Sequence, residues 1–191
     1  PDCLGIEVLD LLAKLRDEYP DKFLWIELGL QTIHEDTARY IRRGYPLSCF
    51  EQACADLKVL QIPFIVHTIL GLPGETNIQL LQTMDYLNRI QPFGIKLQLL
   101  HVLKDTDLAD DYLAGKFEVL TFDAYIDLVI SCLAHLSPDI VIHRVTGDGP
   151  KNLLIAPTWS TDKRSVLNEL HHRMKKQDIR QGDLFQKDNY S

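Results

Sequence analysis

Four stretches of the chain are almost continuously apolar and have the length of a β-strand: 23–30, 63–70, 94–101 and 139–145. Such runs are typical of parallel strands that are covered on both faces, because neither face then needs polar side chains. The segments between the runs have helical patterns of apolar residues. This alternation of strand and helix predicts an α/β fold with a parallel sheet and right-handed crossovers.

Helices are expected between and after these strands. An amphipathic pattern covers 6–18, and further helices are predicted over 122–135 and 162–176. Three segments match the capping box, in which a Ser or Thr and a Glu or Gln three positions later satisfy the first N–H groups of a helix. The boxes begin at Thr32, Ser48 and Thr76, and the first of these helices is expected to end at Gly44.

The length of the chain limits how far the sheet can extend. A closed eight-stranded barrel takes about 250 residues, whereas this chain has 191 and begins with Pro-Asp-Cys, so we expect a piece of a longer protein. The sequence predicts a partial TIM-like barrel, or an open parallel sheet with outer helices, over 1–104. A C-terminal helical extension over 105–191 is expected to pack on it. The first strand would form an exposed sheet edge, through which the chain could self-associate.

Composition narrows the class of protein. A hydrophobic content of 46% suits a globular domain, and a formal charge of −7 argues against a surface that attracts nucleic acid broadly. No apolar run approaches the roughly 18 residues of a membrane span and there is no signal peptide, so we expect a cytoplasmic protein without membrane contact. The four cysteines show no metal-site spacing and are expected to be reduced thiols. They are Cys3, Cys49, Cys54 and Cys132.

A carboxylate interrupts the first apolar run. Glu27 lies within it, and Gln31 follows four residues later on the same face of the strand. Burying an unpaired carboxylate costs several kcal/mol, so Glu27 is expected to meet a ligand or a cation. The candidate cations are Arg43, Lys96 and Arg144.

Every predicted strand also carries polar residues toward its carboxyl end, where ligands bind in parallel α/β folds. Any one of them is explained more simply by a hydrogen-bond partner in the core, but four strands together favour a binding site. After the second strand, Gly71, Pro73 and Gly74 form a tight turn before the helix that starts at Thr76, an arrangement that suits a nucleoside or an anion. The polar set is Glu27, Gln31, His67, Thr68, Gln98, His101, His143, Arg144, Thr146 and Asp148.

These segments, in this order, carry a resemblance to a known family. ELGLQT (27–32), RRGY (42–45) and VHTILGLPGE (66–75) resemble the middle of radical S-adenosylmethionine (radical SAM) proteins. LLHVLKDTDLA (99–109), VIHRVTGDGP (141–150) and LLIAPTWS (153–160) are similar to the YhcC-like subfamily. The resemblance covers nearly the whole chain.

The resemblance implies that the longer protein is an enzyme of oxidoreductase or transferase type. Such enzymes bind a 4Fe–4S cluster through three cysteines and cleave SAM reductively to a 5′-deoxyadenosyl radical. A reductant such as flavodoxin or ferredoxin is then expected as a partner. The family carries its cysteine motif upstream of the matching segments, so the cluster ligands are expected outside this chain, which has no metal ligand of its own and is expected to be inactive.

Site residues follow from the matching motifs. The resemblance implies that SAM is bound by Glu27, Gln31, Arg43, His67, Ile69 and Gly71, with Tyr45 where many relatives have histidine. Arg43 also suits the helix end beside Gly44 for dipole reasons alone. Possible substrate-binding residues are His101, His143, Arg144 and Asp148. The substrate, whether tRNA, protein or metabolite, stays open.

Besides a radical SAM enzyme, two other classes of function are consistent with the sequence. The first is a non-catalytic binding or regulatory domain that retains the barrel. The second is a metal-free barrel lyase or hydrolase that uses Glu27 and a histidine as acid and base.

Overall fold

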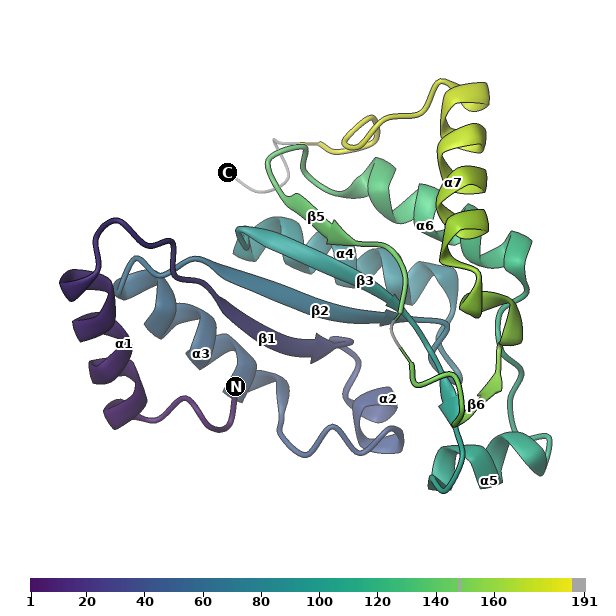
Figure 1. Cartoon of the computed structure of the whole chain (residues 1–191), viewed down its shortest axis with the longest axis horizontal. Helices are drawn as coiled ribbons and strands as arrows, with labels where there is room; N and C mark the ends of the chain where they lie inside the picture. The colour runs from purple at the N-terminus through teal and green to yellow at the C-terminus, as the bar shows by residue number, and fades with distance from the viewer. Residues whose placement is uncertain (148, 187–191) are drawn as a thin grey trace.

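A four-stranded parallel sheet forms the centre of the fold in the computed structural model, which describes residues 1–147 and 149–186. All three strand pairings are parallel. The predicted α/β fold is therefore confirmed as an open sheet, with β1 at one edge and β5 at the other (Figure 1). In spatial order the strands are β1 (Ile26–Gln31), β2 (Phe64–Leu70), β3 (Gly94–Leu99) and β5 (Val141–Arg144).

Helices cover one face of this sheet (Figure 1). Alternate strand residues, such as Leu28 and Leu30 of β1 and Ile95 and Leu97 of β3, are buried toward them. The predicted helix over 122–135 forms at those residues. The helices that cover this face are α3 (Leu47–Val59), α4 (Asn77–Ile90) and α6 (Phe122–His135). Helix α7 (Lys163–Gln177) packs against α6.

The other face of the sheet is more open than the sequence suggests. In β1 and β5 the alternate residues are half-buried or exposed. The expectation that both faces are covered is wrong, because polar side chains on this face, described below, interact with one another instead of with a second helical layer.

Smaller elements complete the chain. Helix α1 (Ile6–Glu18) has no fully buried residue, and α2 (Glu35–Tyr40) and α5 (Asp107–Leu113) are short. Strands β4 (Val102–Leu103) and β6 (Leu154–Ala156) form a separate antiparallel pair, followed by a 3-10 helix, η1 (Thr158–Thr161), none of which the sequence predicts. Across 1–147 and 149–186, no helix combines the length and the apolar character that crossing a membrane requires.

One of the three predicted capping boxes forms. Thr76 caps α4: its hydroxyl accepts from the N–H of Gln79, and the N–H of Thr76 donates to Gln79 Oε1 over 3.0 Å. The box at Thr32 is wrong, because α2 begins at Glu35 and ends at Tyr40, before the predicted Gly44. The Thr32 hydroxyl instead accepts from the N–H of His34 and donates to Glu75 on the turn after β2.

The predicted box at Ser48 is also wrong. Helix α3 begins one residue earlier, at Leu47, with Pro46 in the N-cap position. Its first N–H group donates to Glu35 Oε1 over 2.6 Å. The cap therefore comes from α2, twelve residues away, and a local sequence pattern cannot reveal a partner at that distance.

Candidate functional site

A polar network crosses three strands on the open face of the sheet. Strand β2 places His67 beside Gly29 of β1 and Lys96 of β3 in the strand register. Glu27 lies two positions before Gly29 and Gln98 two positions after Lys96, so all four polar side chains share one face. They approach closely enough to form one hydrogen-bonded group, Glu27, His67, Lys96 and Gln98.

Glu27 is paired with two donors. Its Oε2 accepts from Lys96 Nζ over 2.6 Å and lies 2.7 Å from His67 Nε2. The Glu27 side chain is 38% exposed, so the expectation of a buried carboxylate is wrong. The apolar neighbours of Glu27 face the helices, whereas Glu27 itself faces the open side. Of the candidate cations, Lys96 forms an ion pair with it.

His67 is held in one tautomer by its neighbours. Gln98 Nε2 lies 3.0 Å from His67 Nδ1, and an amide NH₂ only donates, so Nδ1 is the acceptor and Nε2 carries the proton. His67 therefore donates to Glu27. The Lys96 hydrogen bond lowers the pKa of Glu27 to about 2, against the opposing effect of burial. Burial lowers the pKa of His67. A carboxylate and a neutral imidazole result at pH 7.

Near the end of β1, the side chains of Gln31 and Tyr45 lie close to Gly29. A Cβ on Gly29 would lie 2.6 Å from Gln31 Nε2 and 3.0 Å from the Tyr45 hydroxyl. That hydroxyl donates to the Gly29 carbonyl over 2.7 Å. The absence of a side chain at position 29 thus allows the Gln31 amide and Tyr45 to approach the strand. The sequence indicated no role for Tyr45, since its contact depends on a turn fourteen residues from β1.

Arg43 interacts with the protein's own backbone. Its guanidinium donates to the carbonyl oxygens of Thr32 (2.8 Å), Leu30 (3.2 Å) and Tyr45 (2.9 Å), and to Glu35 Oε1 (2.9 Å). The side chain is 1% exposed. Arg43 therefore joins the end of β1 to the α2–α3 turn. Its predicted contact with the SAM carboxylate stays a prediction.

The other predicted cofactor residues lie along β2 and its following turn. Ile69 is half-buried, two positions beyond His67 on the same face. Gly71 has φ of +79°, and a Cβ there would lie 2.8 Å from the Leu120 side chain. Position 71 thus needs glycine for both backbone conformation and space.

Gly71→Ala is expected to destabilise the protein more than Gly74→Ala. Both glycines have φ of +79°, but a Cβ on Gly74 would meet nothing within 4 Å. The backbone cost of about 1–2 kcal/mol is therefore shared, whereas contact with Leu120 adds about 1 kcal/mol or more at position 71 alone. Urea unfolding of both variants measures the difference, and equal stabilities would refute the close packing at Gly71.

Of the predicted substrate-binding residues, His143 and Arg144 line one cavity, described below, whereas His101 contacts Ser160. His101 Nε2 lies 3.1 Å from Ser160 Oγ, and the His101 ring fills the space that a Cβ on Gly147 or Gly149 would take. His143 lies on the open side against Phe93, with ring centroids 5.9 Å apart. Arg144 is half-buried at the end of β5, and the predicted role of Asp148 lies outside the described residues.

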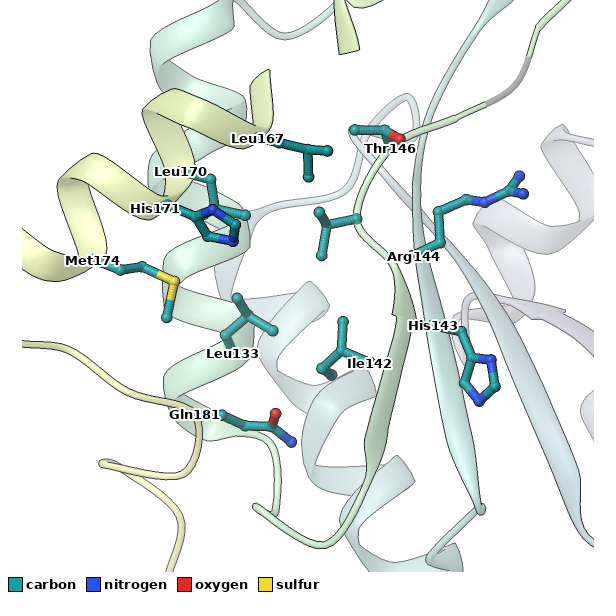
Figure 2. A pocket seen from close by; sticks show the side chains of 11 residues that line it. Leu133, Ile142, His143, Arg144, Thr146, Leu167, Leu170, His171, Met174 and Gln181 are labelled. Carbon is teal, nitrogen blue, oxygen red and sulfur yellow. The ribbon is translucent and has the colours of Figure 1, made fainter. Parts of the chain in front are cut away.

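A cavity of about 510 Å³ lies between β5, α6 and α7. Figure 2 shows the apolar side chains of Leu133, Ile142, Leu170 and Met174 around it, and its polar lining residues include His143, Arg144, His171 and Gln181. The cavity is therefore lined by both apolar and polar side chains, and none of the four residues of the Glu27 network lines it.

The cysteines do not form a metal site in the part of the chain that the structure describes. No group of three or more His, Cys, Asp or Glu side chains there could hold a metal ion. Cys54 and Cys132 are buried, which raises the pKa of each thiol to about 12, whereas Cys3 is exposed. Protonated thiols are poor ligands because the thiolate is the form that binds metal.

The isolated chain is therefore expected to purify without stoichiometric iron and without the brown absorption of a 4Fe–4S cluster. Iron analysis and an absorption spectrum after anaerobic purification check this expectation. A cubane held by Cys49, Cys54 and Cys132 would contradict it, and a Cys49→Ser variant that lost such a cluster would establish the ligand.

Comparison with known proteins gives the family. The model of the radical SAM superfamily matches residues 1–87, and the model of the radical SAM C-terminal domain matches residues 92–176. The chain belongs to the radical SAM superfamily. The two models meet near β3, whereas the sequence pattern places a boundary after residue 104. Because β5 pairs with β3, both parts share one sheet, and the division at residue 104 stays a prediction.

Individual radical SAM relatives extend this result. YtqA of Bacillus subtilis is 38% identical over 98% of this chain and 57% of its own length. YhcC of Escherichia coli K12 is 31% identical over 89% of this chain and 54% of its own length. The chain thus spans about half the length of these relatives. The structure of archaeal Methanocaldococcus infernus Elp3 shares the fold, with a TM-score of 0.75 over 93% of this chain and 40% of that one, at 17% identity.

The two cofactors of the radical SAM family fit this chain differently. The open face offers Glu27 as an acceptor, the amide of Gln31 and the apolar side chain of Ile69, which suit the ammonium, hydroxyl and adenine groups of SAM. A 4Fe–4S cluster does not fit, because the described residues supply no converging thiolates.

Proposed function

We propose that this chain is the SAM-binding part of a radical SAM enzyme. One observation carries the proposal: Glu27 is held as a carboxylate on the open face, and the two hydrogen bonds that it receives within the described part of the chain both end on Oε2. Oε1 is then available to a ligand that donates hydrogen bonds. The ammonium and ribose hydroxyl groups of SAM are such donors.

Glu27 and the residues around it are proposed to bind different groups of SAM. Glu27 would accept from the donors of SAM, and Gln31 would contribute its amide beside Gly29. Ile69, on the same face of β2, would provide apolar contact for the adenine. Arg43 supports this arrangement indirectly, since it fixes the end of β1 through its bonds to Leu30 and Thr32.

The catalytic metal is proposed to come from a longer chain. In radical SAM enzymes the cluster supplies the electron for reductive cleavage of SAM, and a flavodoxin or ferredoxin reduces it. We propose that the parent protein is an oxidoreductase or transferase of this kind, and that the present chain is inactive by itself.

The metal-free acid–base alternative has less support from the geometry. Both ring nitrogens of His67 are engaged, one with Glu27 and one with Gln98. A general base needs a free nitrogen within reach of its substrate. His67 is therefore better suited to holding Glu27 than to moving a substrate proton.

Self-association through the edge of the sheet is a further part of the proposal. Strand β1 has a neighbour on one side only, and Phe23 and Trp25 just before it are 61% and 43% exposed. An unpaired edge beside apolar side chains favours pairing with another chain. Sedimentation of the isolated chain at several concentrations checks this, and a strictly monomeric protein would refute it.

The proposed function is tested by anaerobic reconstitution of the longer protein. Addition of dithionite and SAM is expected to yield 5′-deoxyadenosine, measured by chromatography. The longer protein with Glu27→Gln provides the comparison. Reconstituted protein that carries a 4Fe–4S cluster but forms no 5′-deoxyadenosine would contradict the proposal and favour a binding module.

A further inference from the structure

We propose that Lys96, His67 and Gln98 are positioning residues, which together determine the oxygen of Glu27 that is left for a ligand. The identity of that ligand rests on the proposed function. The arrangement of the four side chains does not, so the two can fail separately.

Both internal hydrogen bonds of Glu27 converge on one oxygen. Lys96 Nζ lies 2.6 Å and His67 Nε2 2.7 Å from Oε2. The two donors come from different strands, β3 and β2, so they fix the carboxylate group against rotation from two directions. Among the described residues, both of these donors bind Oε2, and neither is assigned to Oε1.

Glu27 accepts only from a protonated Nε2, and Gln98 supports this tautomer without touching Glu27. Its amide donates to His67 Nδ1 over 3.0 Å, which leaves the ring proton on Nε2. In the opposite tautomer Nε2 would present a lone pair to the Glu27 carboxylate, and the two acceptors would repel. Gln98 thus acts through the histidine, as partners of metal-bound histidines do when they fix the ring tautomer.

The charges around His67 keep this arrangement in one protonation state. Burial is the largest cause that lowers the His67 pKa, the hydrogen bond to Glu27 on β1 opposes it, and the charges of Lys96 on β3 and Arg144 on β5 lower the pKa further. The neutral ring donates one bond and accepts one. A protonated ring would have to donate at Nδ1 as well, and the Gln98 amide would have to turn so that its oxygen, rather than its NH₂ group, faces Nδ1.

Gln98→Glu tests the inference because it replaces a donor by an acceptor at the same place. The variant is expected to place a proton on His67 Nδ1 and to raise the pKa of His67 by about 1 unit or more, since a carboxylate then lies beside the ring. Nitrogen-15 NMR of the labelled chain over a pH titration reports both tautomer and pKa. The exposed Gln82 on α4 gives the matched control, Gln82→Glu, which makes the same change of charge away from the network.

A second variant and a binding measurement complete the test. Gln98→Leu removes the donor to Nδ1 without adding a charge, so the Nδ1–H tautomer of His67 is expected to be more populated than in the parent chain, although Glu27 still favours the proton on Nε2. S-adenosylhomocysteine, which lacks the sulfonium charge, is the calorimetric probe, and both Gln98 variants are expected to bind it several-fold more weakly than Gln82→Glu does. A His67 tautomer and pKa unchanged in both variants would overturn the positioning inference. If the variants change the His67 tautomer and pKa as expected but neither they nor the parent chain binds S-adenosylhomocysteine, the proposed function is overturned instead.

Discussion

Arg43→Ala is expected to lower the free energy of unfolding by roughly 3–5 kcal/mol, because it leaves buried acceptors without their donor. The guanidinium is 1% exposed and serves three carbonyl oxygens and Glu35. Urea unfolding at pH 7 measures the change. Arg43→Lys is expected to lose most of the same stability, since an ammonium cannot reproduce the planar fork of donors.

Arg39→Ala is the control for this prediction. Arg39 lies on α2, is 76% exposed and pairs with Asp36 over 3.0 Å. An exposed pair of this kind contributes about 0.5 kcal/mol or less. If Arg43→Ala were as stable as Arg39→Ala but bound S-adenosylhomocysteine more weakly, the ligand role predicted from the sequence would replace the structural one.

Glu27→Gln is expected to weaken binding of S-adenosylhomocysteine by about ten- to hundredfold. A hydrogen bond to a charged group contributes about 1.5–3 kcal/mol, and each 1.4 kcal/mol is tenfold in affinity. Isothermal titration calorimetry measures the loss. The melting temperature is expected to fall less than for Arg43→Ala, because the Glu27 side chain is 38% exposed and Lys96 can still reach water.

Lys96→Met separates the two roles of Glu27. It removes the cation, so the pKa of Glu27 is expected to rise from about 2, since the Lys96 hydrogen bond is the largest cause of its depression. A carboxyl group whose folded pKa is depressed adds stability above its unfolded pKa, near 4.5, and loses it as pH falls toward 2. The variant should therefore lose less stability than the parent chain between pH 5 and 3.

For Glu27→Gln, an affinity for S-adenosylhomocysteine that is unchanged in a folded protein would refute the role of Glu27 in binding the ligand.

The sequence predicts the strands well because each is a long apolar run. β2 and β3 begin within a residue of their predicted starts, and α6 has the predicted bounds. Parallel order follows from the alternation with helices. The short β4–β6 pair could not be predicted, since two and three residues carry too little periodicity.

The site could be predicted only in part. Glu27 stands out as a charge inside an apolar run, but its partners depend on strand register, which places Lys96 beside His67. Arg43 has the residue type expected for a cofactor contact, whereas its actual acceptors are backbone groups at the end of β1. Backbone acceptors have no sequence signature, so the side chain's direction was not predictable.

The join between the two family models falls immediately before β3, and this has a consequence for how the protein can change. Glu27 and His67 belong to the segment matched over 1–87, and Lys96 and Gln98 to the segment matched over 92–176. The network thus exists only when both segments fold together, with β2 hydrogen-bonded to β3. A chimera that exchanged one segment between distant relatives would keep the backbone pairing and yet could separate a carboxylate from its lysine. For the network to form, the two segments must therefore carry matching side chains on the shared pair of strands, β2 and β3.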